Sequence, residues 1–363
     1  MKILINISVI TQPSRGMAVF TKQIVKELVK KKNFDYIFVA GNELDQEILE
    51  LILDSKHTFK QINVPLPIFD QIIIPYLIKK YKPDVCWFPS NTFPLIMSKG
   101  TNYIVTIHDI IFLMNEFKLP TIYQRIARFY RVVIIKMGLK KIHKITSVSK
   151  TTLRDLYKRF NISKKTDERD ILYNSLITVK NEDDLIFKKL KMNSTDKYIY
   201  SIAGNGKHKN LEFFIDSFNR FNLIKPNYKL VVSGAFKSEL YRRKYENIIF
   251  TPFISDQEKI SLIKNADLFV FPSLVEGFGI PVIEGLFYNP RVLVSDIPIF
   301  REIAKDYVTY FDPYDKDFIK KYFIEKKSLL NDHQEAKSYI LKTFNLSKST
   351  EKLEKIFFEF KQK

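Results

Sequence analysis

The chain is organised around residues 267–285, Asp-Leu-Phe-Val-Phe-Pro-Ser-Leu-Val-Glu-Gly-Phe-Gly-Ile-Pro-Val-Ile-Glu-Gly. An apolar run at 268–271 predicts a buried strand, and a proline ends it. Gly277 and Gly279 follow, in a chain with only ten glycines, and glycine lets the backbone approach a ligand closely. Pro281 then opens an apolar stretch of helical type. The stretch therefore predicts a strand, a tight loop and a helix start whose free N–H groups attract anions and ligand oxygens.

Two carboxylates bracket this loop, Glu276 at its mouth and Glu284 about one turn into the helix. Both can face one cleft, where carboxylates accept paired hydrogen bonds from the neighbouring hydroxyls of a sugar or a ribose. The alternative is structural, with one acid stabilised by the helix N-terminus and the other a solvated loop residue. The residues alone leave both interpretations open.

Length and composition indicate a globular protein of two domains. The chain has 363 residues, of which 45% are hydrophobic and 27% charged. No apolar run reaches the roughly 18 residues that span a bilayer, and Met1–Asn6 turns polar too quickly for a signal peptide. The single cysteine, Cys86, cannot form an internal disulfide, and we expect it to be buried and inert. We therefore expect a cytoplasmic protein.

The net charge of +19 is compatible with four explanations: nucleic acid, an anionic membrane surface, anionic small substrates, or a coding bias toward lysine. No recognised nucleic-acid-binding module is present, so we expect no nucleic acid partner.

Short apolar runs alternate with helical periodicities along most of the chain, which predicts doubly wound α/β domains. Residues 176–196 are polar and break the pattern, so we place the domain junction there. Two such halves leave a cleft between them, and ligands favour the carboxyl ends of their strands. The strands are expected at 2–8, 36–40, 84–88, 103–107, 142–147 and 170–173, then at 198–203, 229–233, 248–251, 267–271, 292–295 and 308–311.

Residues 272–285 resemble the signature of the retaining, nucleotide-sugar-dependent glycosyltransferases of family 4, also called glycosyl transferases group 1. Further segments resemble that family in the same order along the chain, so the resemblance covers nearly all of it. These segments are Val105–Asp109, Ser147–Lys150, Ile171–Asn174, Lys207–Asn210, Val231–Gly234 and Asp312–Pro313.

The resemblance implies the α/β GT-B fold, two Rossmann-like doubly wound domains facing a cleft. It assigns residues 1–176 to the acceptor-binding domain and 177–345 to the nucleotide-sugar donor domain. A terminal helix at about 346–363 is expected to pack back on the first domain.

The family's site residues carry over by position. Glu276 would contact hydroxyls of the donor sugar, and Glu284 would bind the ribose hydroxyls. Lys209 would neutralise the diphosphate, and His108 would touch the sugar from the other domain. The remaining donor-binding positions are Gly16, before the first helix, Lys207, and the backbone N–H groups of Phe278, Gly279 and Ile280.

These roles have a physical reason, because a leaving nucleoside diphosphate gains negative charge as the glycosidic bond breaks. A fixed cation and a helix N-terminus stabilise that charge. We therefore expect a metal-independent enzyme without a cofactor beyond its sugar-nucleotide co-substrate. Asp315-Lys316-Asp317 has the spacing of a metal pair but lies in a stretch that we interpret as surface.

The chain departs from the family pattern at two places. Relatives have an arginine about five residues before the lysine, where this chain has Gly204 or Asn205. Either Lys207 substitutes for it or the second cation is missing. The family's Gly-x-Pro-Val turn is replaced by Tyr288–Val292, and we expect Asn289 to adopt the positive φ that glycine would.

Residues 121–144 predict a long helix with unusual surface chemistry. Its apolar arc is expected to hold Ile126, Tyr130, Val133, Ile134 and Met137. The opposite arc mixes Arg125, Arg128, Arg131, Lys136 and Lys140 with Phe129, Val132, Ile135 and Leu139. Such mixing suits an anionic membrane surface, and the alternative is a helix buried on most sides with its arginines reaching water.

We expect a retaining glycosyltransferase that moves a hexose-type sugar, mannose favoured, from a nucleoside diphosphate to a glycan or polyprenyl-linked acceptor. The expected pathway is a bacterial surface polysaccharide such as O-antigen or capsule, with peripheral association at the inner face of the cytoplasmic membrane. Two alternatives remain: a GT-B nucleotide-sugar epimerase, and a catalytically silent sugar-nucleotide-binding subunit, which the weakened cation site would favour.

Overall fold

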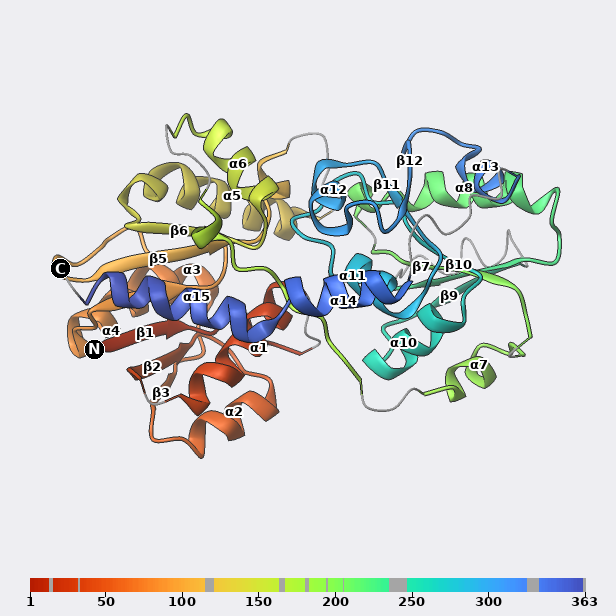
Figure 1. Cartoon of the computed structure of the whole chain (residues 1–363). Helices are drawn as coiled ribbons and strands as arrows, with labels where there is room; N and C mark the ends of the chain where they lie inside the picture. The colour runs from red at the N-terminus through yellow and green to blue at the C-terminus, as the bar shows by residue number, and fades with distance from the viewer. Residues whose placement is uncertain are drawn as a thin grey trace. The chain divides into compact units, whose positions relative to one another are not determined.

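The computed structural model describes residues 1–12, 16–31, 33–114, 121–162, 167–179, 183–193, 195–204, 206–234, 247–324 and 333–361. The chain forms two compact units, Met1–Ser175 with Phe344–Lys363, and Leu176–Thr343. Each contains a six-stranded parallel sheet with helices around it (Figure 1). The division lies one residue from the junction expected at 176/177.

The sheet of the first unit has the strand order β3-β2-β1-β4-β5-β6. Its central strands are buried along nearly their whole length, as parallel strands covered on both faces are. The strands are β1 (Lys2–Asn6), β2 (Asp35–Ala40), β3 (Thr58–Gln61), β4 (Val85–Phe88), β5 (Asn102–Ile107) and β6 (Lys144–Ser147). The helices are α1 (Gly16–Lys30), α2 (Gln46–Leu53), α3 (Leu66–Ile68), α4 (Ile74–Tyr81), α5 (Ile122–Gly138), α6 (Lys150–Arg159) and α15 (Leu346–Glu359).

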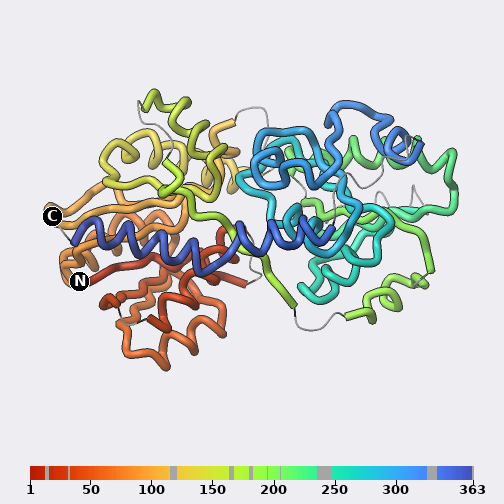
Figure 2. Tube along the Cα trace, in the orientation of Figure 1, coloured from red at the N-terminus to blue at the C-terminus, as the bar shows by residue number. Residues whose placement is uncertain are grey.

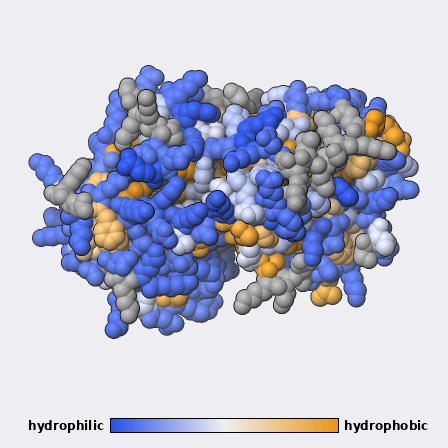
Figure 3. Space-filling view, viewed as in Figure 1, coloured by the Kyte–Doolittle hydropathy of each residue, from blue (hydrophilic) through white to orange (hydrophobic). Residues whose placement is uncertain are grey.

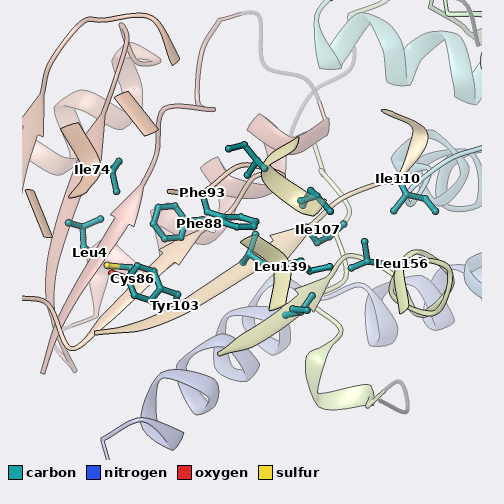
Figure 4. Packing of buried hydrophobic residues seen from close by; sticks show 14 of the residues in the cluster. Leu4, Ile74, Cys86, Phe88, Phe93, Tyr103, Ile107, Ile110, Leu139 and Leu156 are labelled. Carbon is teal, nitrogen blue, oxygen red and sulfur yellow. The ribbon is translucent and has the colours of Figure 1, made fainter. Parts of the chain in front are cut away.

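One hydrophobic cluster joins the sheet of this unit to its helices. Cys86 and Tyr103 on the strands lie in it with Ile74 of α4 and Leu156 of α6 (Figure 4). Cys86 is fully buried, and burial raises the pKa of its thiol, so the inert cysteine expected from the sequence fits its position.

Helix α15 belongs to the first unit, so the described chain both begins and ends there (Figure 2). The ring of Phe357 lies edge-on to Phe34, with 5.8 Å between the ring centroids. Lys31 and the mostly buried Glu354 form an ion pair, with 2.5 Å between Nζ and Oε2. These contacts hold the last helix against α1 and the sheet.

The second unit repeats the architecture with the strand order β12-β11-β10-β7-β8-β9. Its strands are β7 (Tyr198–Ile202), β8 (Lys229–Ser233), β9 (Ile248–Thr251), β10 (Leu268–Phe271), β11 (Val292–Ser295) and β12 (Thr309–Phe311). Its helices are α7 (Leu185–Lys189), α8 (Leu211–Asn222), α10 (Asp256–Asn265), α11 (Ile280–Tyr288), α12 (Pro298–Ala304), α13 (Phe318–Ile324) and α14 (His333–Thr343).

Two elements differ from the sequence expectation. Strand β3 was not expected, because it is a half-exposed edge strand whose side chains carry no apolar run. Residues 170–173 were expected to form a strand, but they contribute only an isolated bridge between Ser147 and Ile171 after a 3-10 turn at Glu168–Asp170. The side chain of Asp167 caps that turn. Because the capped turn extends to Asp170, the residues after it are too few to form a β-ladder with β6.

Polar side chains dominate the face that Figure 3 shows, with scattered apolar residues between them. No helix in the described ranges is both long enough and apolar enough to cross a membrane.

The turn after α11 corrects the expectation of a positive φ at Asn289. Its φ is −129°, an ordinary extended value. The side chain is 2% exposed and its amide donates to the carbonyls of Ile263 and Ala266, at 2.6 and 2.8 Å. Asn289 is therefore selected for its hydrogen bonds to the end of α10, and glycine could not replace them.

We expect Asn289→Gly to lower the free energy of unfolding by about 1–3 kcal/mol, because two buried carbonyls lose their donor. The matched control is Asn161→Gly, at an exposed residue with a φ of 49°, where glycine adopts the backbone without strain. Its effect should stay within about 0.5 kcal/mol. Denaturant unfolding of both variants measures the difference, and equal effects would contradict the assignment.

Candidate functional site

The loop between β10 and α11 is shaped by Gly279. Its φ of 100° lies in the left-handed region, and it directly precedes the first residue of α11. A Cβ at this position would lie 2.9 Å from the ring of Phe300 on α12. A side chain is therefore excluded here by conformation and by space. The first N–H groups of α11 have no acceptor within the helix, so they point to whatever lies before it.

Glu276 lies in this loop and pairs with Lys209. The distance from Lys209 Nζ to Glu276 Oε1 is 2.5 Å, and the side chains are 24% and 12% exposed. The ammonium also lies 5.4 Å from the ring centroid of Phe271, the last residue of β10. The structure thus brings together two of the residues that the sequence assigned to the donor.

Backbone contacts hold Lys209 beside the loop. The N–H of Leu274 donates to the carbonyl of His208 at 2.7 Å, which joins the 3-10 turn at Lys207–Lys209 to the segment after β10. Asn210 follows with a left-handed φ of 55°, and its amide donates to the carbonyl of Pro313 at 3.0 Å. Segments far apart in the sequence therefore meet at the carboxyl edge of this sheet.

Glu284 is 1% exposed and pairs with a different cation, Lys259 of α10. Lys259 Nζ lies 2.6 Å from Glu284 Oε1 and 2.8 Å from Asp256 Oδ1. Burial raises the pKa of Glu284, and the ion pair with Lys259 opposes that rise. The two carboxylates of the signature are thus held by two separate lysines, which argues against an acid–base pair.

Buried polar atoms without a hydrogen-bond partner occur where β10 and β11 end and on α11. Ser273 Oγ and Ser295 Oγ are buried without a hydrogen-bond partner, as is Glu284 Oε2. The two strands are adjacent, with Phe271 opposite Val294. A buried polar atom without a partner costs about 1–3 kcal/mol, so such a group points to a ligand or to water.

The other donor-binding positions of this unit lie on the same two segments. Lys207 begins the 3-10 turn that ends at Lys209, is exposed, and forms no ion pair with a described residue. Phe278 is 4% exposed, and Ile280 begins α11. Asn205, considered as the site of the missing arginine, lies outside the described residues. Within the described ranges, no group of three His, Cys, Asp or Glu side chains could hold a metal ion.

In the first unit, His108 follows the last residue of β5 and is 5% exposed. Its Nε2 lies 2.9 Å from the carbonyl of Pro89, its N–H donates to Asn91 Oδ1, and its ring packs edge-on to Phe20. Burial lowers the pKa of His108 to about 4, so the imidazole is neutral at pH 7. It can orient a hydroxyl but cannot supply a positive charge.

Gly16 is the first residue of α1 and is exposed, with open space where a Cβ would lie.

Two contacts of the site were not predicted from the sequence. Lys259 lies on an ordinary surface-type helix whose start, a capping box between Ser255 and Glu258, gives no sign of a partner 25 residues away. The carbonyl of His208 acts through the backbone, which side-chain patterns do not reveal. The hydroxyl of Ser295, the last residue of β11, is buried without a hydrogen-bond partner.

Replacing Lys259 with methionine should leave Glu284 buried without its cation and destabilise the protein by about 3–5 kcal/mol. The folded-state pKa of Glu284 is already above its usual value, so its ionisation costs stability as the pH rises. Without Lys259 that pKa rises further, and the loss should grow between pH 5 and pH 8.

Thermal unfolding at both pH values tests this pair. The double variant Lys259→Met with Glu284→Gln removes the buried charge and should show no such growth. A single variant that is equally destabilised at pH 5 and pH 8 would contradict the ion pair.

Comparison with known proteins adds to this geometry. Residues 182–343 match a family described as glycosyl transferases group 1. RfbU, an O-antigen chain mannosyltransferase of Salmonella typhimurium strain LT2, is 30% identical over 239 residues, which cover 62% of this chain and 60% of RfbU. The chain thus matches about three fifths of the length of that relative.

Solved structures support the fold. Anabaena HepE, in complex with UDP and glucose, matches with a TM-score of 0.66 and 13% identity, over 98% of this chain and 99% of HepE. WaaG, a glycosyltransferase involved in lipopolysaccharide biosynthesis, matches with a TM-score of 0.65 and 14% identity, over 98% and 99%. At these identities the matches show the fold alone. They confirm the expected α/β class, the GT-B fold with two Rossmann-like domains.

Proposed function

We propose that this protein is a glycosyltransferase of surface polysaccharide synthesis, because residues 182–343 match the family model of glycosyl transferases group 1. It transfers a hexose, with mannose favoured, from a nucleoside diphosphate sugar to a glycan or polyprenyl-linked acceptor. The name of RfbU supports mannose and an O-antigen product. The observation that carries the proposal is the Lys209–Glu276 pair beside the N-terminus of α11.

The pair gives the second unit a means of binding both halves of a sugar nucleotide. A diphosphate competes with Glu276 for the ammonium of Lys209, since both ligands are anionic. Once Lys209 turns to the diphosphate, the carboxylate is free to accept hydrogen bonds from two neighbouring sugar hydroxyls. The N–H groups of Gly279 and Ile280 add a helix N-terminus that favours phosphate oxygens.

Glu284 lies one turn farther along α11 and has an unpartnered oxygen, Oε2. In the proposal this oxygen accepts from the ribose, while Lys259 holds the other carboxylate oxygen, Oε1. The hydroxyls of Ser273 and Ser295, also without partners, provide further contacts at the same strand ends.

The reaction proceeds with retention at the anomeric carbon. The bond between that carbon and the diphosphate oxygen breaks, the acceptor oxygen bonds to the same face, and a donor phosphate oxygen receives the acceptor's proton. Lys209 and the start of α11 stabilise the leaving diphosphate, so we propose that no metal is needed. His108, neutral at pH 7, orients the sugar.

Glu276→Gln should lower sugar transfer about 100-fold, because a neutral amide cannot accept the paired hydroxyl bonds that strengthen in the transition state. Transfer is measured on the full chain with a panel of GDP-mannose and UDP-hexoses and a polyprenyl-linked acceptor, with and without EDTA. Glu335→Gln, an exposed carboxylate of α14, is the matched control and should keep full activity.

Four results would count against the proposal. Unchanged turnover in Glu276→Gln would contradict the assignment of Glu276 to the donor site. Loss of activity in EDTA would contradict the proposal that no metal is needed. Donor conversion without an acceptor would favour the epimerase. An inverted anomeric configuration in the product, read by proton NMR, would exclude retention.

A further inference from the structure

Helix α5 exposes a long apolar stripe. Ile122, Ile126, Phe129 and Met137 are between 62% and 76% exposed. Their spacing, together with Val133, places them on one face of the helix. Ile126 and Met137 of the expected apolar arc are exposed, whereas Ile134 of that arc is buried together with Ile135 from the opposite arc. The alternative of a helix buried on most sides is wrong, because the buried residues of α5 are Ile134, Ile135 and Gly138.

A cationic groove runs beside this stripe. It has a volume of about 930 Å³ and is lined by ten residues, five of them basic and none acidic. From α5 the lining includes Arg125, Arg128, Lys136 and Lys140, which are spaced three, eight and four residues apart, and Val132 lies in the gap between Arg128 and Lys136. These positions share one face of the helix. Arg159 of α6 lies across from them. Lys136 and Lys140 form no ion pair with a described residue.

Two of the arginines are held in place. Arg128 donates to the carbonyls of Phe112 and Met114, at 2.8 and 2.5 Å, and Arg159 donates to the carbonyl of Leu113 at 3.1 Å. Three successive backbone carbonyls thus fix both guanidinium groups on the groove wall. Cations held in this way lose little entropy on binding an anion.

The groove is amphipathic as well as cationic. Phe129, Val132 and Phe160 line it together with the basic residues. Phe129 also belongs to the exposed apolar stripe, so the groove opens directly onto apolar surface. A ligand that fills both must join an anionic head to an apolar chain.

We propose that this groove binds the diphosphate head of a single prenyl lipid, with the first isoprene units on the apolar stripe of α5. The proposal rests on the proposed function, because it makes the groove the seat of the lipid-linked acceptor. It differs from a general attraction to an anionic bilayer, since arginines that backbone carbonyls hold in a groove of limited volume select one head group.

Calorimetric titration of the full chain with farnesyl diphosphate tests the proposal without any sugar donor. Inorganic diphosphate and farnesol, each carrying half of the ligand, should bind at least 10-fold more weakly. The double variant Lys136→Gln with Lys140→Gln should weaken farnesyl diphosphate binding about 10- to 30-fold, given the contribution of each cation near an anionic lipid. Lys79→Gln with Lys80→Gln, at exposed lysines of α4, should leave it unchanged.

Phe129→Ser gives a second, independent readout, because it should weaken farnesyl diphosphate while leaving inorganic diphosphate unchanged. Equal affinity for inorganic diphosphate would reduce the groove to an anion site and overturn the proposal. Displacement of farnesyl diphosphate by phosphatidylglycerol vesicles would show that the groove recognises a bilayer, which also overturns it. Neither result touches the assignment of Glu276, whose failure is read separately from donor turnover.

Discussion

The turn at Gly279 is the constraint on which the candidate site depends. A left-handed backbone and the ring of Phe300 together exclude any side chain there, so β10 passes into α11 within a loop of fixed shape. That shape leaves Glu276 partly exposed beside Lys209 and carries Glu284 one turn down into the interior. The positions of both carboxylates therefore follow from one backbone conformation.

The two carboxylates are similar in sequence and different in environment. Glu276 is partly exposed and shares its lysine with any arriving anion, so its partner can change during a reaction. Glu284 is fully buried, and burial and Lys259 act in opposite directions on its pKa. A residue held in this way suits a binding role that persists through turnover. Each carboxylate is paired with its own lysine, which suits a binding role better than that of a general acid.

Much of the fold could be predicted from the sequence, because parallel strands covered on both faces read as continuous apolar runs. Eleven of the twelve strands lie where such runs predicted them, and β3 escaped because its edge position needs no apolar run. A strand was wrongly predicted at 170–173, because the apolar residues of this segment pack without forming a β-ladder. The Gly279 loop and Lys209 were also predictable, because each lies in a short contiguous motif, residues 272–285 and 207–210 respectively.

The rest of the site depends on tertiary contacts that a sequence does not display. Lys259 lies 25 residues before Glu284, and Asn289 holds its turn by side-chain bonds to α10 instead of by a positive φ. On α5 the sequence showed the mixture of basic and apolar residues. Only the structure shows that Ile135 is buried, Ile126 is exposed, and the basic residues line a groove with Arg159.

The central claim, that the second unit binds a nucleoside diphosphate at the start of α11, is tested most directly by hydrogen–deuterium exchange. Exchange would be measured on the full chain with and without GDP, and repeated with UDP. We predict slower exchange in peptides covering 274–284 and 206–211, with no change along α5. Protection confined to other parts of the chain, or none at nucleotide concentrations that saturate binding, would contradict the account.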